Sequence, residues 1–413
     1  MRILAIHPDF AHGGGDFNFY DVAKAMHEQE HEITIATMHC DEYWMSLFKP
    51  IATDYIIVES KCVPGDWFHP IIVLAFKAFF RWGRKFDLLL LDNCVSTVPV
   101  CKFLFNAPIF FLFFYPRSLI VESENVVQNI YAKELSWIEG WCVRFCEFLP
   151  TISNFSSELC FELNIRETSK KLLLSFQRKT LHELCPQLPL RKCPLFHPCL
   201  PTLVVQAHES ENYPALGSNI EGSFFLSLNR ISPEKNHELA IKSFAKLKDL
   251  IPGEKWQQLQ LIIVGNLLER YPHCVKYFEK LRKMVDDMNL EEKVKFFLNV
   301  SEKEKTYFLQ NCIALLHTPP REHFGLVVLE GMYFGKPVIS STEGGPVEII
   351  SNEKDGILTP AKPEYFSVAM SRVLIDSLWL DTLKVKAKET VQKRFMHHEL
   401  SVRLREIMEL FVG

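Results

Sequence analysis

The chain has 413 residues, which is enough for two hydrophobic cores, so its length predicts two domains. Charged residues make up 23% of the chain and the formal net charge is −4, and this balance gives no indication of a nucleic-acid partner. The twelve cysteines lack the C-x-x-C spacing of a zinc site, and the N-terminal apolar run is too short for a signal sequence, so we expect reduced thiols that pack in the interior.

The first half of the chain alternates strand-like and helix-like segments. Residues 86–92 form an almost continuous apolar run, as expected for a parallel strand that is covered on both faces. Similar runs predict further strands at residues 2–7, 31–38, 107–114 and 149–153. Because strands alternate with helices, such as the one expected at residues 17–29, we predict an α/β doubly wound sheet that binds ligands at the carboxyl ends of its strands.

A run of three glycines, Gly13 to Gly15, follows the first predicted strand and precedes the first predicted helix. Glycines at such a turn let a phosphate or a sugar approach the backbone closely. Any tight turn uses glycines too, so the cluster alone does not identify a ligand. Gly14 and Gly15 are candidate ligand-binding residues.

Residues 70–82 are strongly apolar, but they are interrupted by Lys77 and followed by Arg84 and Lys85. No segment of the chain reaches the roughly 20 apolar residues that a membrane-spanning helix needs. Two interpretations stay open: a helix that lies in a membrane interface, or a helix in the core of the first domain.

The alternating pattern stops between residues 165 and 222, where basic residues mix with prolines and cysteines. We interpret this stretch as a domain linker that is enlarged by an insertion. A zinc site is an alternative, but its candidate ligands fit no usual zinc-site spacing. These candidates are His182, Cys185, Cys193, His197 and Cys199.

A second series of strands and helices begins at residue 223. Strands are expected at residues 224–228, 259–265 and 294–297, and a helix at residues 237–247. Arg230 and Lys235 stand across the first strand-to-helix turn. At the carboxyl end of a parallel strand they can converge on a diphosphate, the arginine as a planar fork and the lysine as a point charge. The alternative is that both are solvated surface residues.

Residues 312–333 have the pattern of a strand, a loop and a helix. Glu322 falls in the loop and Glu330 in the helix, so both carboxylates can reach one crevice. Gly325 lies where the helix begins and lets backbone amides approach an anion at the positive end of the helix dipole. A second glycine turn, Gly344-Gly345, precedes another helix start. The pattern indicates a site for a nucleotide or a sugar phosphate, whereas two glutamates alone more often lie on a solvated helix face.

The stretch from Thr318 to Glu330 resembles the signature of retaining family-4 glycosyltransferases, in which two glutamates separated by seven residues flank a Phe-Gly pair. Here that pair is Phe324-Gly325. The resemblance extends along most of the chain outside the insertion and includes His7-Pro8-Asp9 and residues 227–236. It implies two Rossmann-like doubly wound domains that face a cleft, the GT-B type.

The expected domain boundaries follow from the strand pattern and from this resemblance. Residues 1–200 would form the acceptor-side domain, with the linker and insertion at about residues 165–222. Residues 223–385 would form the nucleotide-sugar-binding domain. Residues 386–413 would form a last helix that crosses back to the first domain.

Within this family, the chain resembles the eukaryotic mannosyltransferases that add α-1,3- and α-1,6-linked mannose during assembly of the dolichol-linked oligosaccharide, the precursor in N-glycosylation. This resemblance implies GDP-mannose as the donor, no cofactor and no bound metal. The implied acceptors are mannosyl- and then dimannosyl-chitobiose linked to dolichol pyrophosphate. The implied location is the cytosolic face of the endoplasmic reticulum membrane, with the membrane surface and other mannosyltransferases of the pathway as partners.

The resemblance also implies roles for single residues. Arg230 and Lys235 would hold the diphosphate as the mannose leaves. Glu322 would contact the sugar and stabilise its oxocarbenium-like centre, and Glu330 would bind the ribose hydroxyls. No enzyme nucleophile is placed, so the leaving phosphate would accept the proton of the acceptor. The remaining donor-binding candidates are Gly14, Gly15, Phe324, Gly325 and Leu326.

Two departures from the family pattern bear on activity. Gly13-Gly14-Gly15-Asp16 replaces the usual Gly-Gly-Ala-Glu, which is a mild change. Phe114 stands where the family has a histidine that touches the transferred sugar, and the loss of that hydrogen-bond donor predicts a low catalytic rate. Two rival hypotheses stay open: a family-4 enzyme with another donor or acceptor, and a non-catalytic paralogue that binds nucleotide sugar as a scaffold.

Overall fold

A computed structural model of the chain describes residues 1–10, 13–58, 68–112, 114, 141–142, 145–153, 196–209, 222–269 and 271–412. The chain forms two compact units, each with its own parallel sheet. Unit 1 comprises Met1–Pro198 and His397–Gly413, and unit 2 comprises Cys199–Met396.

The described strands of unit 1 form a parallel sheet with the order β3-β2-β1-β4-β5. They are β1 (Arg2–Asp9), β2 (Glu32–His39), β3 (Ala52–Ile57), β4 (Leu88–Asp92) and β5 (Ile109–Leu112). Every residue of β4 is buried, as its apolar sequence predicts for a strand covered on both faces. The order reverses between β1 and β4, so the carboxyl ends of these two strands flank the switch point of the sheet.

The sequence pattern differs from this sheet in two places. It does not predict β3, because the sequence of this edge strand contains Thr53 and Asp54 among its apolar residues. The strand predicted at residues 149–153 is wrong. Phe148, just before it, forms only an isolated bridge with Phe110, and Pro150 lacks the amide hydrogen that a strand ladder needs.

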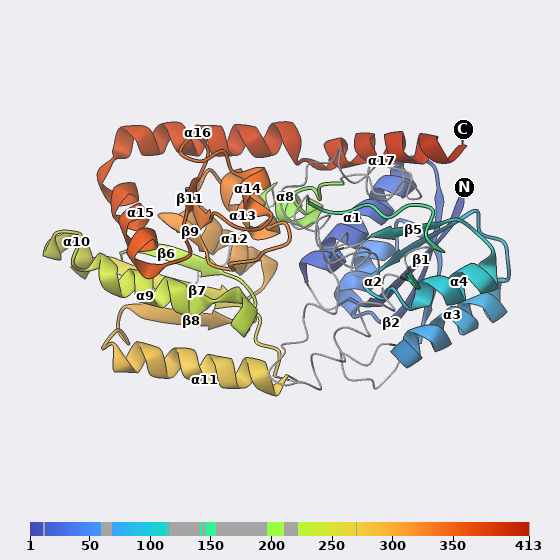
Figure 1. The fold of residues 1–413 in the computed structure, drawn as a ribbon, viewed down its shortest axis with the longest axis horizontal. Helices are drawn as coiled ribbons and strands as arrows, with labels where there is room; N and C mark the ends of the chain where they lie inside the picture. The colour runs from blue at the N-terminus through green and yellow to red at the C-terminus, as the bar shows by residue number, and fades with distance from the viewer. Residues whose placement is uncertain are drawn as a thin grey trace, which may run out of the picture. The chain divides into compact units, whose positions relative to one another are not determined.

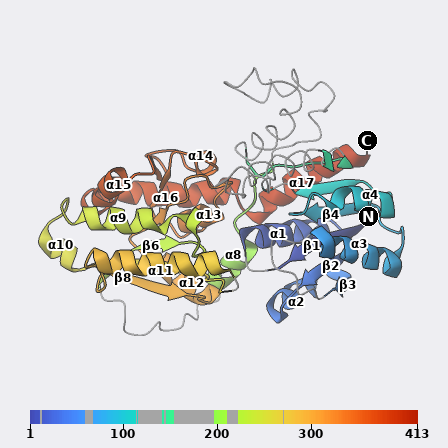
Figure 2. The same cartoon turned by 60° about the horizontal axis from the view of Figure 1, so that its bottom comes forward.

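The helices of unit 1 pack against this sheet and against one another. α3 (Phe68–Trp82) and α4 (Thr97–Phe105) lie side by side in both views and share a core with alternate residues of β1, β4 and β5 (Figures 1 and 2). α1 (Gly14–Glu28) packs on β1 and β2, and α17 (His397–Val412) packs along α1. α2 (Glu42–Phe48) follows β2.

α3 combines features of both interpretations of residues 70–82. Ile71, Leu74 and Ala78 are buried in the core of unit 1. On the same helix, Phe80 is 81% exposed and Phe76 is 41% exposed. α3 is therefore a core helix with one exposed apolar edge. No helix among the described residues is long and apolar enough to cross a membrane.

The described strands of unit 2 form a second parallel sheet, with the order β11-β10-β9-β6-β7-β8. They are β6 (Ser223–Leu228), β7 (Leu259–Gly265), β8 (Val294–Leu298), β9 (Ala314–His317), β10 (Val338–Ser341) and β11 (Ile357–Thr359). The order reverses between β6 and β9, so their carboxyl ends flank the switch point of this sheet. β11 is an edge strand of three residues, too short for a prediction from periodicity.

One group of helices shares a core with alternate residues of β6, β7 and β9. It consists of α9 (His237–Leu247), α11 (Pro272–Asp287) and α15 (Pro363–Ile375). α15 lies along α9 in both views (Figures 1 and 2). The other described helices of unit 2 are α8 (Thr202–Glu209), η4 (Pro233–Lys235), α10 (Gly253–Gln257), α12 (Glu302–Asn311), α13 (Leu326–Tyr333), α14 (Pro346–Ile349) and α16 (Ser377–Arg394).

The contacts draw the boundaries of the units differently from the sequence pattern. α8, from the predicted linker, belongs to unit 2, and α16 continues in unit 2 past the predicted start of the last segment. α17 belongs to unit 1, where Gln29 Nε2 donates to Ser401 O at 2.9 Å. Most of the predicted insertion lies outside the described residues, as do the zinc candidates His182, Cys185 and Cys193.

Candidate functional site

The stretch predicted as a strand, a loop and a helix has this structure in unit 2. β9 ends at His317, the loop carries Glu322, and α13 begins after Gly325. Gly325 has a φ of +107°, in the left-handed region where a side chain is strained. Glycine therefore lets the loop turn directly into the first turn of α13, whose free amides carry the positive end of the helix dipole.

Lys235, at the end of η4, and Glu322, in the loop after β9, form an ion pair. Lys235 Nζ lies 2.6 Å from Glu322 Oε2. Thr318 Oγ1 donates to the carbonyl oxygen of Lys235 at 2.8 Å and ties the end of η4 to the loop. Burial opposes the charge of Glu322, but Lys235 outweighs it and lowers the pKa of this carboxyl to about 2. Glu322 is therefore a carboxylate at neutral pH and is held against a cation.

Gly344 and Gly345 bring a second backbone turn against this loop. Gly345 N donates to Glu322 O at 2.7 Å. A Cβ at Gly344, which has a φ of +77°, would lie 2.4 Å from the same oxygen. A Cβ at Gly345 would lie 2.3 Å from Phe324 Cα. Any side chain at either position would push the turn away from Glu322, so the two glycines fix the position of the loop.

Glu330 is buried in α13, and a lysine holds one of its oxygens. Lys305 Nζ, on α12, lies 3.3 Å from Glu330 Oε1 and 2.6 Å from Glu302 Oε2. Glu330 Oε2 is also buried, but it has no hydrogen-bond partner among the described residues. A buried acceptor without a partner is costly, so Glu330 is suited to accept a hydrogen bond from a hydroxyl of a ligand.

The structure does not pair Arg230 with Lys235. Arg230 follows β6, and its half-exposed guanidinium lies 2.9 Å from Glu234, whereas Lys235 bonds Glu322. The two cations thus lie in the same turn and contact different carboxylates. Whether both bind the same diphosphate stays a prediction.

Two buried histidines belong to this region, although the sequence pattern predicts no role for them. His237 Nε2 donates to Arg230 O at 3.2 Å and its Nδ1 accepts from Ser227 Oγ at 2.9 Å, so it fixes the backbone of Arg230. Burial lowers the pKa of His317 to about 4, and neither of its ring nitrogens has a hydrogen-bond partner among the described residues. The available signal for His317 was its place at the end of an apolar run, directly before the loop.

Gly14 and Gly15 lie in unit 1, in the first turn of α1 rather than in a loop before it. The helix therefore begins earlier than predicted, with Gly13 as its N-cap. Asp16 supplies the capping carboxylate, because Gly13 N donates to Asp16 Oδ2 at 2.7 Å. A Cβ at Gly15 would lie 3.5 Å from the ring of Phe114. The glycine turn and Phe114 are thus neighbours at the carboxyl edge of this sheet.

His7 links this turn to the sheet. His7 Nδ1 lies 2.8 Å from Asp92 Oδ1 at the end of β4, and His7 Nε2 lies 3.1 Å from Asp16 Oδ1. Burial opposes a charge on His7, but Asp92 and Asp16 outweigh it and raise the pKa of the ring to about 10. An imidazolium therefore joins the ends of β1 and β4 to the first turn of α1.

The stabilising contribution of His7 is expected to disappear between about pH 6.5 and pH 10. The pKa of His7 is about 10 in the folded chain, whereas the ordinary value of a histidine is 6.5, so the contribution is complete below pH 6.5 and is lost as the pH rises. His7→Gln should therefore lower the melting temperature at pH 6 and change it little at pH 10. Melting temperatures of both proteins at several pH values test this. A difference that is the same at every pH would contradict a charged His7.

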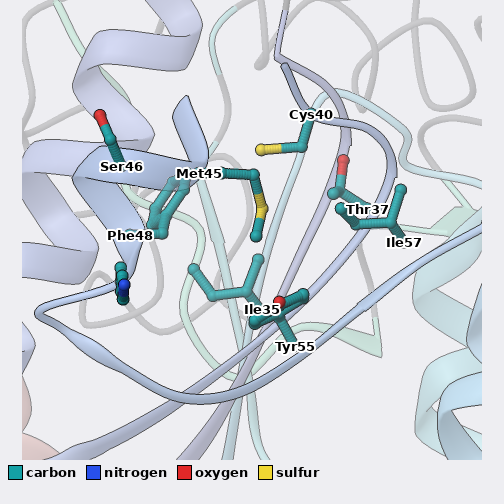
Figure 3. Close-up of a pocket in the computed structure, with 9 residues that line it drawn as sticks. Ile35, Thr37, Cys40, Met45, Ser46, Phe48, Tyr55 and Ile57 are labelled. Atoms are coloured by element: carbon teal, nitrogen blue, oxygen red, sulfur yellow. The ribbon is translucent and has the colours of Figure 1, made fainter. Parts of the chain in front are cut away.

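A pocket of about 340 Å³ lies elsewhere in unit 1, between α2 and the neighbouring strands β2 and β3 (Figure 3). Its lining residues are Ile35, Thr37, Cys40, Met45, Ser46, Phe48, Lys49, Tyr55 and Ile57. Burial raises the pKa of the Cys40 thiol to about 12, so the thiol is uncharged at neutral pH. The lining is mostly apolar and includes no predicted site residue, and we assign the pocket no role in chemistry.

Known proteins match this chain over nearly its whole length. Residues 209–394 match the family model described as glycosyl transferases group 1. The chain is 27% identical to the α-1,3/1,6-mannosyltransferase ALG2 of Mus musculus, over 95% of this chain and 92% of the mouse protein. It is 25% identical to the protein of the same name from Homo sapiens, over 99% of this chain and 96% of the human protein.

Solved structures match the fold. Anabaena Alr3699/HepE in complex with UDP-glucose has a TM-score of 0.71 at 17% identity, over 99% of both chains. Sucrose-phosphate synthase from Thermosynechococcus elongatus has a TM-score of 0.72 at 17% identity, over 100% of this chain and 99% of the synthase. The predicted α/β fold with two Rossmann-like units, the GT-B type, is confirmed.

Proposed function

We propose that this chain is a glycosyltransferase of the GT-B type, which transfers mannose from GDP-mannose to a dolichol-linked oligosaccharide with retention of the anomeric configuration. The proposed acceptors are mannosyl- and then dimannosyl-chitobiose linked to dolichol pyrophosphate, extended through α-1,3 and α-1,6 linkages. The observation that carries the proposal is the pairing of Lys235 with Glu322 beside the switch point of the unit 2 sheet. The name of the relatives, α-1,3/1,6-mannosyltransferase, supports the choice of sugar.

Lys235 and Arg230 would bind the diphosphate of the donor. Both follow β6 at its carboxyl end, and the carbonyl groups of both are held in place, by Thr318 and His237 respectively. In the transfer, the bond between the sugar C1 and the diphosphate oxygen breaks, and negative charge grows on the leaving group. Fixed cations in a partly desolvated site stabilise that charge. The family resemblance implies no bound metal or cofactor, and we propose the same for this reaction.

Glu322 would stabilise the positive charge that develops on the sugar ring. Its carboxylate is ionised and largely shielded from water, so its field on a nearby oxocarbenium-like centre is strong. The acceptor hydroxyl attacks C1 on the face from which the diphosphate leaves, and its proton passes to the departing phosphate oxygen. This step retains the configuration without an enzyme nucleophile.

The remaining proposed contacts bind the donor rather than react with it. Glu330 would accept hydrogen bonds from the ribose hydroxyls through the oxygen that has no partner among the described residues. The backbone amides of Phe324, Gly325 and Leu326 would contact the donor where α13 begins. In unit 1, Gly14 and Gly15 stay candidate ligand-binding residues.

The proposed acceptor is a membrane lipid, and unit 1 carries a surface that fits a membrane. Phe80 on α3 and Phe103 on the adjacent α4 are 81% and 78% exposed, and Phe76 is 41% exposed. We call these three residues the aromatic patch. Lys77 lies on the same helix and is exposed, so the patch combines apolar rings with a positive charge. We propose that this surface rests on the cytosolic face of the endoplasmic reticulum membrane, where other mannosyltransferases of the pathway would be partners.

The direct test is a transfer assay with purified chain. GDP-mannose and a mannosyl-chitobiosyl diphosphate lipid are incubated with it, and the mass of the lipid is followed. The expected result is the addition of one and then two hexoses, and none with Glu322→Gln. Hexose addition from UDP-glucose instead of GDP-mannose would assign another donor. Binding of GDP-mannose without any transfer would favour the non-catalytic scaffold.

Phe114→His is expected to raise the catalytic rate by about tenfold or more. Phe114 is buried beside Gly15, and a phenyl ring cannot donate the hydrogen bond that an imidazole donates to a sugar hydroxyl. One recovered hydrogen bond in a preorganised site is worth roughly this factor. GDP-mannose affinity should change little, because the proposed diphosphate and ribose contacts lie in unit 2.

Tyr115 provides the control for this prediction, although it lies outside the described residues. Its hydroxyl would replace the missing donor if Tyr115, and not Phe114, stands at the position of the family's histidine. In that case the unmodified chain has an ordinary rate, Tyr115→Phe abolishes it, and Phe114→His has no effect. This outcome would contradict the assignment of Phe114.

A further inference from the structure

Glu330 combines a functional oxygen with an unfavourable position for its charge. Its side chain is 6% exposed, and one of its two oxygens has no hydrogen-bond partner among the described residues. Burial raises the pKa of this carboxyl, the charge of Lys305 lowers it, and Glu302 raises it further. Among the charged side chains of the described residues that act on Glu330, Lys305 is the one that favours the ionised form.

Lys305 lies on α12, and two carboxylates fix the position of its ammonium group. Its ammonium group bridges Glu302 and Glu330, and its side chain is 13% exposed. The helix begins with a reciprocal cap, in which Glu304 N donates to Ser301 Oγ at 3.3 Å and Ser301 N donates to Glu304 Oε2 at 2.7 Å. The position of the ammonium group is thus set by the fold.

We propose that Lys305 is a positioning residue of the nucleotide site: it holds Oε1 of Glu330, so that Oε2 accepts hydrogen bonds from the ribose hydroxyls of a nucleoside diphosphate. This inference rests on the proposed function, because it requires that unit 2 binds a nucleotide sugar. An ionised carboxylate accepts hydrogen bonds at both oxygens, so Oε2 can accept from a ribose hydroxyl while Lys305 holds Oε1. A protonated carboxyl carries its proton on one oxygen, and that oxygen then donates a hydrogen bond.

The other elements that pack on α13 also carry titratable groups. β9 carries His317, whose ring is neutral because burial lowers its pKa to about 4. α14 carries Glu348, and α16 carries Lys384, which acts on Lys336 beyond the end of α13. The shift at Glu330 has Lys305 and Glu302 as its charged causes. The pH dependence is therefore expected to follow this pair.

The test measures the affinity of the full chain for GDP between pH 5.5 and pH 8.5. Lys305→Met removes the cation, so Glu330 should bind its proton until a higher pH. GDP affinity should then fall about tenfold at pH 6 and recover to within about threefold of the unmodified chain at pH 8.5. Lys305→Arg keeps the charge and should restore most of the affinity at low pH. Lys280→Met removes a surface lysine that pairs with Glu238 and serves as the matched control.

A double substitution separates positioning from a general structural effect. If Lys305 acts through Glu330, adding Lys305→Met to Glu330→Gln should not weaken GDP binding further, and this charge-balanced pair should also remain folded if the single variant does not. Equal losses in both backgrounds, or a Lys305→Met affinity that falls equally at every pH, would overturn the inference. Failure of the unmodified chain to bind GDP or UDP would overturn the proposed function as well.

Discussion

Lys235→Ala is expected to lower the rate of sugar transfer by about 100-fold to 1000-fold. Lys235 brings a full positive charge into a largely buried position beside Glu322 and would offset the charge of the leaving diphosphate. Removing one such group from a preorganised site typically costs this much. Steady-state rates with GDP-mannose and the lipid acceptor measure the effect, and Lys280→Ala on the surface is the control.

The same substitution leaves Glu322 buried without its cation, so a loss of rate must be distinguished from a loss of fold. Glu322→Gln combined with Lys235→Ala restores the local charge balance, and this double variant should melt closer to the unmodified chain than Lys235→Ala does. It should remain inactive. An unchanged rate for a folded Lys235→Ala chain would remove Lys235 from the site and weaken the whole assignment of unit 2.

The part of the site that the sequence predicts well is the part that is local. The strand, loop and helix from Cys312 to Tyr333 follow from one apolar run, one glycine and one helical periodicity, and the structure forms them as predicted. Gly344 and Gly345 also lie where the pattern places them, although their close approach to Glu322 is a tertiary fact. Neighbouring residues carry enough information to predict such elements, because the apolar residues of each element recur at the spacing typical of a strand or of a helix.

The contacts that adjust the chemistry are those that the sequence pattern does not predict. Lys305 lies on α12, and no local pattern connects it with Glu330 on α13. His237 was predicted only as the start of a helix, and its hydrogen bond to the carbonyl of Arg230 depends on how η4 folds back on β6. Even the two cations that were predicted to act together are separated, because Arg230 forms an ion pair with the nearby Glu234. These arrangements depend on tertiary packing, which no single-sequence periodicity encodes.

The structure also changes the experiment that tests membrane binding. The apolar sequence of α3 suggests replacing Phe76, Phe79 and Phe80 together, but Phe79 is partly buried against the core and lies edge-on to Phe105 at 5.7 Å. Its loss would destabilise unit 1 whether or not a membrane is bound. The exposed ring on the neighbouring helix, Phe103, is the better third position.

Replacing the aromatic patch by serines (Phe76→Ser, Phe80→Ser and Phe103→Ser) is expected to lower binding to lipid vesicles by about 100-fold. If each exposed ring contributes roughly 1 kcal/mol by entering the interface, three rings account for about this factor. Because the rings project from the core, the melting temperature should change little.

Co-sedimentation with vesicles that contain anionic lipid measures the fraction of the chain that is bound to the membrane. The matched control is Ile375→Ser with Leu378→Ser, which removes two exposed apolar side chains, 64% and 85% exposed, from unit 2. Equal loss of binding in the control, or none in the patch variant, would show that the aromatic patch does not hold the chain on the membrane.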